Sequence, residues 1–252
     1  MPFHCSVTIY KVCTDEEKAR RVWTGLEKRL SREAMRLVAV SWLSELRELN
    51  QSLFHYICKA FAPPPKGTGS ACGDAQPKSI ERNFADPDVL AVTNIARRVL
   101  HEQLRMKQFI RFQKAKDGTY LGVVAPDHDV LPLVIDHFQD RFNDQPWLIY
   151  DAHRHYGYYY TPSLAEAGLA VQSASAGRDG VVRVTFEDES AVPFDLSSGK
   201  LSDDVLSAND ELFQQLWRTY FKAICIRERI NPKKQLSDMP RRYWKYMTEK
   251  NG

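Results

Sequence analysis

The stretch 106–160 constrains the fold more than any other part of this sequence, because strand-like runs there alternate with turns. Two such runs, 108–113 and 119–125, flank the pair Asp117-Gly118. An Asp-Gly pair between alternating hydrophobic runs is a strong signal for a β-hairpin. We therefore predict a hairpin at the start of this stretch.

A second hairpin is indicated where the runs 147–151 and 156–160 are separated by a short polar turn. Between the two hairpins, apolar residues recur at helical spacing and predict a short helix with one buried face: Val134, Ile135, Phe138 and Phe142. One more alternating strand is predicted at 181–186. The fold class is therefore predicted to be α+β, with an antiparallel sheet of about five strands and helices packed before, within and after it.

Helices are predicted both before and after the sheet along the chain. Three short ones precede it, over 14–30, 31–50 and 53–61, and a longer helix begins at Asp86-Pro87, where an N-cap residue is followed by proline at the first helical position. The buried face of this longer helix is predicted to hold Val89, Val92, Ile95, Ala96, Val99 and Leu104. A later helix, beginning near residue 210, has a heavy apolar face: Leu212, Phe213, Leu216, Trp217, Tyr220, Phe221 and Ile224.

The segment 62–82 breaks the helical pattern with three consecutive prolines, three glycines and no apolar periodicity. It could mark a domain boundary. We predict instead a long loop within a single α+β domain spanning 14–249, because the N-terminal helices alone are a small unit.

Composition narrows the class of protein. The 252 residues are 43% hydrophobic and 27% charged, with a net charge of +3, so no global charge demands a nucleic acid or membrane partner. Five cysteines without paired Cys-x-x-Cys spacing indicate a reducing compartment. The sequence has no signal-peptide pattern and no apolar run of about 18 residues, so we predict a cytoplasmic protein.

Nucleotide-binding glycine motifs and iron–sulfur cysteine clusters are also missing from the sequence, and we predict no cofactor.

Positive charge gathers near the C-terminus, where 227–250 holds eight cations and three anions. Arg241, Arg242 and Lys245 interleave there with Tyr243, Trp244 and Tyr246, and cations combined with exposed rings can hold single-stranded or distorted nucleic acid. On a helix starting at residue 240, however, Tyr243, Trp244 and Met247 would share one face and pack inward. The cations would then form only a solvated rim.

Two acidic and histidine-containing turns are candidates for chemistry. His128, between Asp127 and Asp129, could act with an acid in proton transfer, although Asp129 is also placed to cap the following helix. Asp151 ends a strand, and with His153 and His155 it satisfies a minimal metal geometry, a pattern that is common by chance. We predict no metal. Tyr156 and Tyr158 could stack on bases, or could serve as half-buried strand residues.

Three blocks of sequence resemble a known family. They are 105–112, 126–151 and 239–249. They are similar to a bacterial domain of unknown function described as a probable DNA metabolism protein, whose members sit beside a radical-SAM protein related to spore photoproduct lyase and are in some cases fused to a uracil-DNA-glycosylase-like domain. The resemblance implies a DNA repair process rather than a named reaction. Members begin with an aromatic-Asp-Gly-x-Phe-x-Gly segment that 1–12 does not contain, so we expect this chain to be truncated there or to lack any activity of that segment.

Three functions are therefore open. The first is a DNA-binding accessory protein in DNA repair or modification that works with a radical-SAM partner. Its base contacts would come from Tyr156 or Tyr158. Its phosphate contacts would come from five cations: Lys107, Arg111, Arg241, Arg242 and Lys245. The second is an enzyme acting on a nucleic-acid base or nucleotide through His128, Asp127 and Asp151. The third is a protein-binding adaptor.

Overall fold

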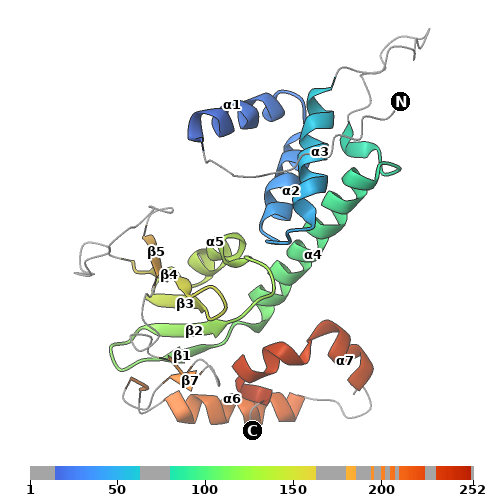
Figure 1. The fold of residues 1–252 in the computed structure, drawn as a ribbon. Coiled ribbons are helices and arrows are strands. Elements are labelled where there is room, and N and C mark those ends of the chain that lie inside the picture. The colour runs from blue at the N-terminus through green and yellow to red at the C-terminus, as the bar shows by residue number, and fades with distance from the viewer. Residues whose placement is uncertain are drawn as a thin grey trace. The chain divides into compact units, whose positions relative to one another are not determined.

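The structure is a computed structural model that describes residues 15–62, 80–162, 180–185, 194–195, 200–201, 205–207, 210–224 and 231–250. The chain divides into two compact units, the first comprising 1–42 and 46–96 and the second 43–45 and 97–252 (Figure 1). Most of the proline-rich segment 62–82 lies outside the described residues. The single domain over 14–249 stays a prediction.

The first unit is helical. It contains α1 (Glu16–Glu27), α2 (Arg32–Trp42), α3 (Leu49–Phe61), η1 (Ile80–Arg82) and the beginning of α4 (Pro87–Phe109). Its core is formed by apolar faces of these helices, with Leu26, Val38, Leu53, Tyr56 and Val92 among the buried side chains. The second helix ends eight residues before the predicted boundary because the chain turns at Glu45, whose φ is +56°.

The long helix α4 begins as the sequence predicts, because the Asp86 side chain accepts the backbone N–H groups of Asp88 and Val89 at 2.9 and 3.4 Å. It continues to Phe109, so the strand predicted to start at 108 begins only at Phe112. The prediction of its buried face is wrong for one residue. Leu104 is 52% exposed, whereas Glu102 and Met106 are buried on the stripe that continues from Val99.

The second unit is built on a five-stranded sheet of β1 (Phe112–Lys114), β2 (Tyr120–Val124), β3 (Trp147–Asp151), β4 (Tyr156–Tyr160) and β5 (Val181–Thr185), in that spatial order. The α+β class is thus confirmed. The first hairpin closes at Gly118, whose φ is +90°, and the second at the 152–155 turn. A second small sheet pairs β6 (Phe194–Asp195) with β7 (Lys200–Leu201).

The sheet is mixed rather than wholly antiparallel. Every neighbouring pair is antiparallel except β2 and β3, which run parallel with Val124 opposite Asp151. Helix α5 (Leu131–Arg141) connects these two strands, and a helical crossover returns the chain to the edge from which it started. The predicted buried face of α5 is confirmed for Val134, Ile135 and Phe138, whereas Phe142 follows the helix as its C-cap residue and is half-buried.

The C-terminal elements complete the second unit: α6 (Asp210–Ile224), α7 (Pro232–Asp238), η4 (Arg241–Tyr246) and η5 (Thr248–Lys250). Tyr246 of η4 packs against one face of the sheet with Leu121, Val123, Leu148 and Tyr150, and Phe138 of α5 contacts Trp147 on the other face. The basic segment 231–250 is therefore part of the folded unit.

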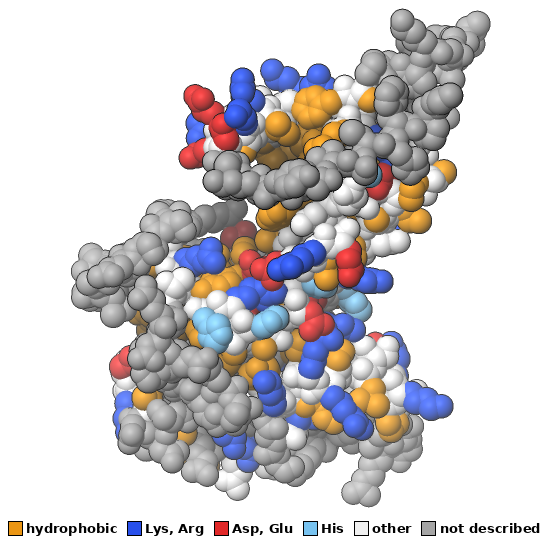
Figure 2. All heavy atoms as spheres, in the orientation of Figure 1, with side chains coloured by type: hydrophobic (Ala, Val, Ile, Leu, Met, Phe, Trp, Pro, Cys, Tyr) orange, Lys and Arg blue, Asp and Glu red, His pale blue; other side chains and the backbone are white. Residues whose placement is uncertain are grey.

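Charge is dispersed over the face of the molecule that Figure 2 draws. On the face drawn in Figure 2, Lys and Arg side chains lie among hydrophobic, neutral and acidic ones and do not form one continuous patch. Among the described residues, no helix combines the length and apolar character needed to cross a membrane.

Candidate functional site

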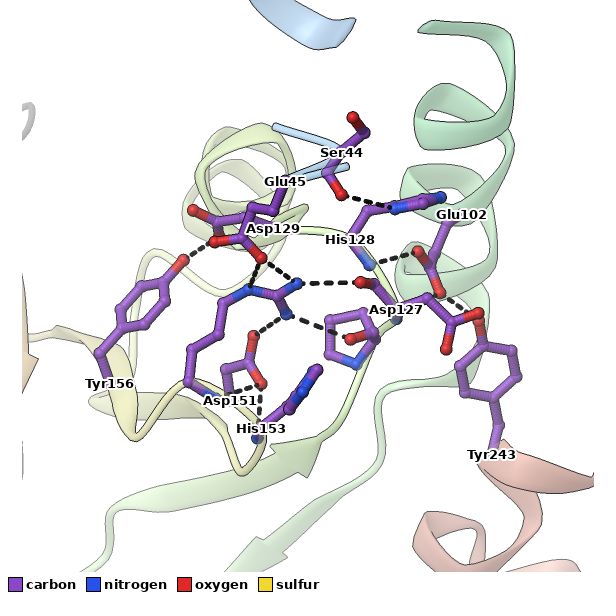
Figure 3. Close-up of polar contacts among 12 residues, drawn as sticks. Ser44, Glu45, Glu102, Asp127, His128, Asp129, Asp151, His153, Tyr156 and Tyr243 are labelled. Atoms are coloured by element: carbon purple, nitrogen blue, oxygen red, sulfur yellow. Dashed lines mark hydrogen bonds and ion pairs between the residues drawn. The ribbon is translucent and has the colours of Figure 1, made fainter. Parts of the chain in front are cut away.

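The parallel pairing of β2 and β3 determines where the candidate residues lie. Because parallel strands end at the same edge of a sheet, the turn 126–129 after β2 lies beside the turn 152–155 after β3. Ligand sites of open sheets with parallel strands commonly occupy this edge. Figure 3 shows side chains from both turns converging there with side chains from α4, η4 and the 43–45 segment.

Glu102 of α4 is one of two buried acids at this site, with only 3% of its surface exposed. Its carboxylate accepts the backbone N–H groups of Asp127 and His128, each at 2.9 Å, and the hydroxyl of Tyr243 at 2.5 Å (Figure 3). Arg242 donates to it at 3.3 Å and to the Asp127 carboxylate at 2.8 Å. One carboxylate thus joins α4, the 126–129 turn and η4.

The protonation of this group follows from its partners. Burial alone would raise the pKa of the Glu102 carboxyl, but the hydroxyl of Tyr243 and the two backbone N–H groups stabilise the charged form and leave its pKa below the ordinary value of 4.5. Burial and the Glu102 charge raise the pKa of Tyr243, so its hydroxyl remains a donor. Glu102 is therefore a structural anion at neutral pH.

Arg154 is a largely covered cation at the site, with 10% of its side chain exposed. Its guanidinium donates to Asp151 at 2.9 Å and to Glu45 at 2.6 and 2.7 Å, and also to the backbone oxygens of Pro126 and Asp127 at 3.1 and 3.0 Å. All of its donor groups are therefore engaged. Burial raises the pKa of the Asp151 carboxyl, while Arg154 and the N–H of His153 act in the opposite direction.

This arrangement gives two of the predicted catalytic residues structural partners. Asp151 is fully buried against Arg154 and accepts the backbone N–H of His153 at 2.8 Å, as an Asx-type turn requires. The carboxylate of Asp127 pairs with Arg242. Their participation in catalysis stays a prediction.

Asp129 does not cap α5, which is a correction to one of the interpretations of the sequence. The N-cap residue is Val130, which makes no side-chain cap bond. Asp129 instead accepts a short hydrogen bond from the hydroxyl of Tyr156 on β4, and burial together with this carboxylate raises the pKa of the tyrosine. The turn is thus connected to β4 as well.

His128 is half-buried and is oriented from two sides. Its backbone N–H donates to Glu102, and its ring Nδ1 lies 3.3 Å from the backbone oxygen of Ser44 (Figure 3). A carbonyl oxygen can only accept, so this contact requires the proton on Nδ1. Among the residues that the structure describes, no hydrogen bond reaches Nε2, which is then the basic nitrogen.

The cations predicted to contact nucleic acid fall into two groups. Arg241 and Lys245 extend from η4 as exposed side chains, while the buried Tyr243 and Met247 hold this segment on the fold. Arg242 is partly exposed and is held by Glu102 and Asp127. The packing alternative is therefore realised for Tyr243 and Met247, and contact of the exposed cations with nucleic acid stays a prediction.

The other two predicted cations lie at the C-terminal end of α4. Arg111 forms an ion pair with Glu249 at 2.6 Å and donates to the backbone oxygens of Gln108 and Ile110. Lys107 is half-buried, and its charge contributes, after burial, to the lowered pKa of His137. A phosphate contact of Arg111 would have to compete with the buried Glu249.

The two predicted base-stacking tyrosines are largely covered. Tyr156 is buried, with the guanidinium of Arg183 4.2 Å from its ring centroid, and Tyr158 is half-buried against it at 5.9 Å between rings. Contacts of these rings with bases stay a prediction. Within the described part of the chain, no group of three His, Cys, Asp or Glu side chains is arranged to hold a metal ion, and the carboxylate of Asp151 is directed to Arg154.

Comparison with known proteins assigns the chain to a family. Its sequence matches a domain of unknown function, DUF4130, over residues 48–249, which is more than half of the chain. The chain belongs to this family. The DUF4130 region contains Glu102, Arg154 and η4, whereas Ser44 and Glu45 precede it. No curated protein and no solved structure matches the sequence.

The sequence interpretation missed the two residues that organise this DUF4130 site. Glu102 could have been found, because it lies on the apolar stripe of α4 between Val99 and Met106, and a charged residue on such a stripe is usually paired. Arg154 has no comparable signal. It stands between two histidines in a polar turn, and its partners are more than twenty residues away along the chain, except for the nearby Asp151.

Glu102 generates a prediction for the pH dependence of stability. A carboxyl whose folded pKa is depressed stabilises the fold above its unfolded pKa and loses this contribution as pH falls through the folded pKa. We expect Glu102→Gln to lower the free energy of unfolding by about 2 kcal/mol at pH 7. The deficit relative to wild type should shrink as the pH falls below the ordinary glutamate pKa of 4.5 and through the lower folded pKa, as measured in urea unfolding curves.

The exposed Asp144→Asn variant removes one carboxylate without touching this network and controls for the loss of charge. A Glu102→Gln deficit that stays constant through the acid range would contradict the account of Glu102 as a hydrogen-bonded anion.

Proposed function

We propose that this chain is a DNA-binding accessory protein in DNA repair or modification that works with a radical-SAM partner in the cytoplasm. The repair process and the partner are supported by the resemblance of the three sequence blocks alone. DNA binding is supported in addition by the placement of cations on η4. The family itself is a domain of unknown function.

The observation that carries the DNA-binding proposal is the anchoring of η4. Tyr243 and Met247 are buried at 2% and 0% exposure, so the segment between them is fixed to the sheet and α4. Arg241 and Lys245 project outward, with their charges 5.9 and 4.6 Å from the ring centroids of Trp244 and Tyr246. Cations on a folded segment lose less conformational freedom on binding phosphate than cations on a loose tail.

The dispersed charge sets the expected strength of binding. With a net charge of +3 and no continuous basic patch on the face of Figure 2, only a few phosphates can be neutralised at once. The logarithm of the binding constant should therefore fall with the logarithm of salt with a slope of about −2 to −4. Such a protein fits an accessory role, in which weak binding is reinforced by a partner.

The η4 cations can be tested directly. We expect the double variant Arg241→Ala/Lys245→Ala to bind a fluorescein-labelled single-stranded oligonucleotide about 10-fold more weakly at low salt and to reduce the salt slope by about 1.5, because each phosphate contact contributes about 0.7 for a single strand. Fluorescence anisotropy over a salt series measures both quantities.

The double variant Lys18→Ala/Arg20→Ala is the matched control, because it removes two exposed cations of α1 that already pair with Asp15 and Glu16. Equal losses in both double variants would show a nonspecific charge effect. Absence of binding by wild type at low salt would reject DNA binding altogether.

A second candidate, an enzyme acting on a nucleic-acid base or nucleotide, is favoured by the orientation of His128. A general base needs one ring nitrogen held by a hydrogen bond and the other available to take a proton. The Ser44 oxygen can hold Nδ1 and leave Nε2 for substrate. In this proposal Arg154 and Glu102 position the turn, while Asp127 and Asp151 act through their partners.

The enzyme candidate predicts one tautomer for His128. Nitrogen-15 NMR of the labelled protein at neutral pH should show neutral His128 protonated on Nδ1, because the Ser44 carbonyl accepts from that nitrogen. The exposed His153 serves as the internal comparison. A proton on Nε2 in neutral His128 would exclude it as the base proposed here.

A further inference from the structure

Helix α6 exposes an unusual set of side chains. Five large apolar residues along one side of it are 40 to 63% exposed: Leu212, Phe213, Leu216, Trp217 and Tyr220. We refer to these five residues as the α6 stripe. Their spacing places them on adjacent rows of one helix face, which is the pattern of a buried surface. The apolar face indicated by the sequence is therefore directed outward.

The side of α6 that borders the stripe explains this orientation. Asp210 is buried, accepts the backbone N–H of Lys114 on β1 at 2.9 Å, and receives a hydrogen bond from Gln214 at 3.2 Å. Trp217 lies at the inner margin of the stripe, where its indole N–H donates to Glu249 of η5 at 3.2 Å. Polar contacts thus fix the inner side of the helix, and the apolar side remains without a cover among the described residues.

The α6 stripe is large enough for an interface. A large side chain buries about 150–250 Å² when fully covered, so five that are roughly half exposed offer about 500 Å². The largest patch on a typical monomer is about 300–600 Å², and a standard interface buries about 800 Å² per partner. The stripe alone supplies more than half of one side of such an interface.

We propose that a second copy of this chain covers the α6 stripe, with the two α6 helices packed antiparallel about a two-fold axis near Leu216. The stripe suits this symmetry, because Leu212 and Tyr220 stand at equal sequence distances on either side of Leu216. Leu212 of each copy then meets Tyr220 of the other, and the two Leu216 side chains meet at the axis. Such an interface is isologous and closes on itself.

The charges around the stripe select this partner over others. The stripe itself carries no charge, and its outer border is formed by Gln215 and Thr219, which are exposed and neutral. On the inner border the cation Arg111 is paired with Glu249. A two-fold axis places the outer border of one copy against the outer border of the second copy. Two neutral borders therefore meet without repulsion. Nucleic acid and anionic lipid would instead require unpaired cations at this surface.

The test is the oligomeric state of the full chain. We expect light scattering after size exclusion and sedimentation velocity to show a dimer with a Kd of about 10 µM or tighter. Leu216→Glu should raise this Kd about 100-fold, because it places two like charges at the axis. Thr219→Lys should also weaken the dimer, since it adds repulsion at the border and leaves every apolar contact in place.

Leu104→Glu is the matched control, because Leu104 is a comparably exposed leucine on α4, and it should leave the Kd unchanged. Circular dichroism shows whether each variant is folded. A chain that is monomeric up to about 100 µM would overturn the proposal. So would a dimer that survives Leu216→Glu, or a monomer that binds phosphatidylglycerol vesicles through Leu216, which would make lipid the occupant.

Discussion

The second unit depends on a single buried carboxylate. Glu102 sits on the apolar stripe of α4 and is compensated by two backbone N–H groups, a tyrosine hydroxyl and a guanidinium. Burial of an anion is tolerated only when its hydrogen-bonding capacity is filled, and these donors come from two segments, the 126–129 turn and η4. Glu102 therefore fixes the 126–129 turn and η4 to α4 with one group, and both candidate surfaces inherit their geometry from it.

Arg154 holds the same turn from the other side. It joins the end of β3 to the backbone of Pro126 and Asp127. Glu102 and Arg154 therefore bind the 126–129 turn from two sides, at the edge where β2 and β3 end. This loop presents His128 next to the anchored segment that carries Arg241 and Lys245. An oriented histidine and cations on an anchored segment are consistent with both functions proposed above, since each needs positioned groups rather than mobile ones.

Local signals in the sequence are sufficient to predict most of the helices and strands, but they are insufficient to predict which residues meet at the candidate site. Asp117-Gly118 and the alternation at 147–160 predict both hairpins, because turn chemistry and side-chain period are local. The parallel pairing of β2 with β3 is a long-range feature, and it alone brings Asp151 to the same edge as Asp127. The outward face of α6 was equally unpredictable, because periodicity shows that a face is apolar without showing what covers it.

Hydrogen exchange at the Asp127 and His128 amides tests most directly whether Glu102 organises this unit. Both N–H groups donate to its carboxylate, so in wild type they should exchange slowly, and in Glu102→Leu both should exchange about 10- to 100-fold faster. The amide of Ile149, which is buried on the central strand β3, reports on global unfolding in both proteins. Retained protection of Asp127 and His128 in the variant, with Ile149 unchanged, would contradict the account.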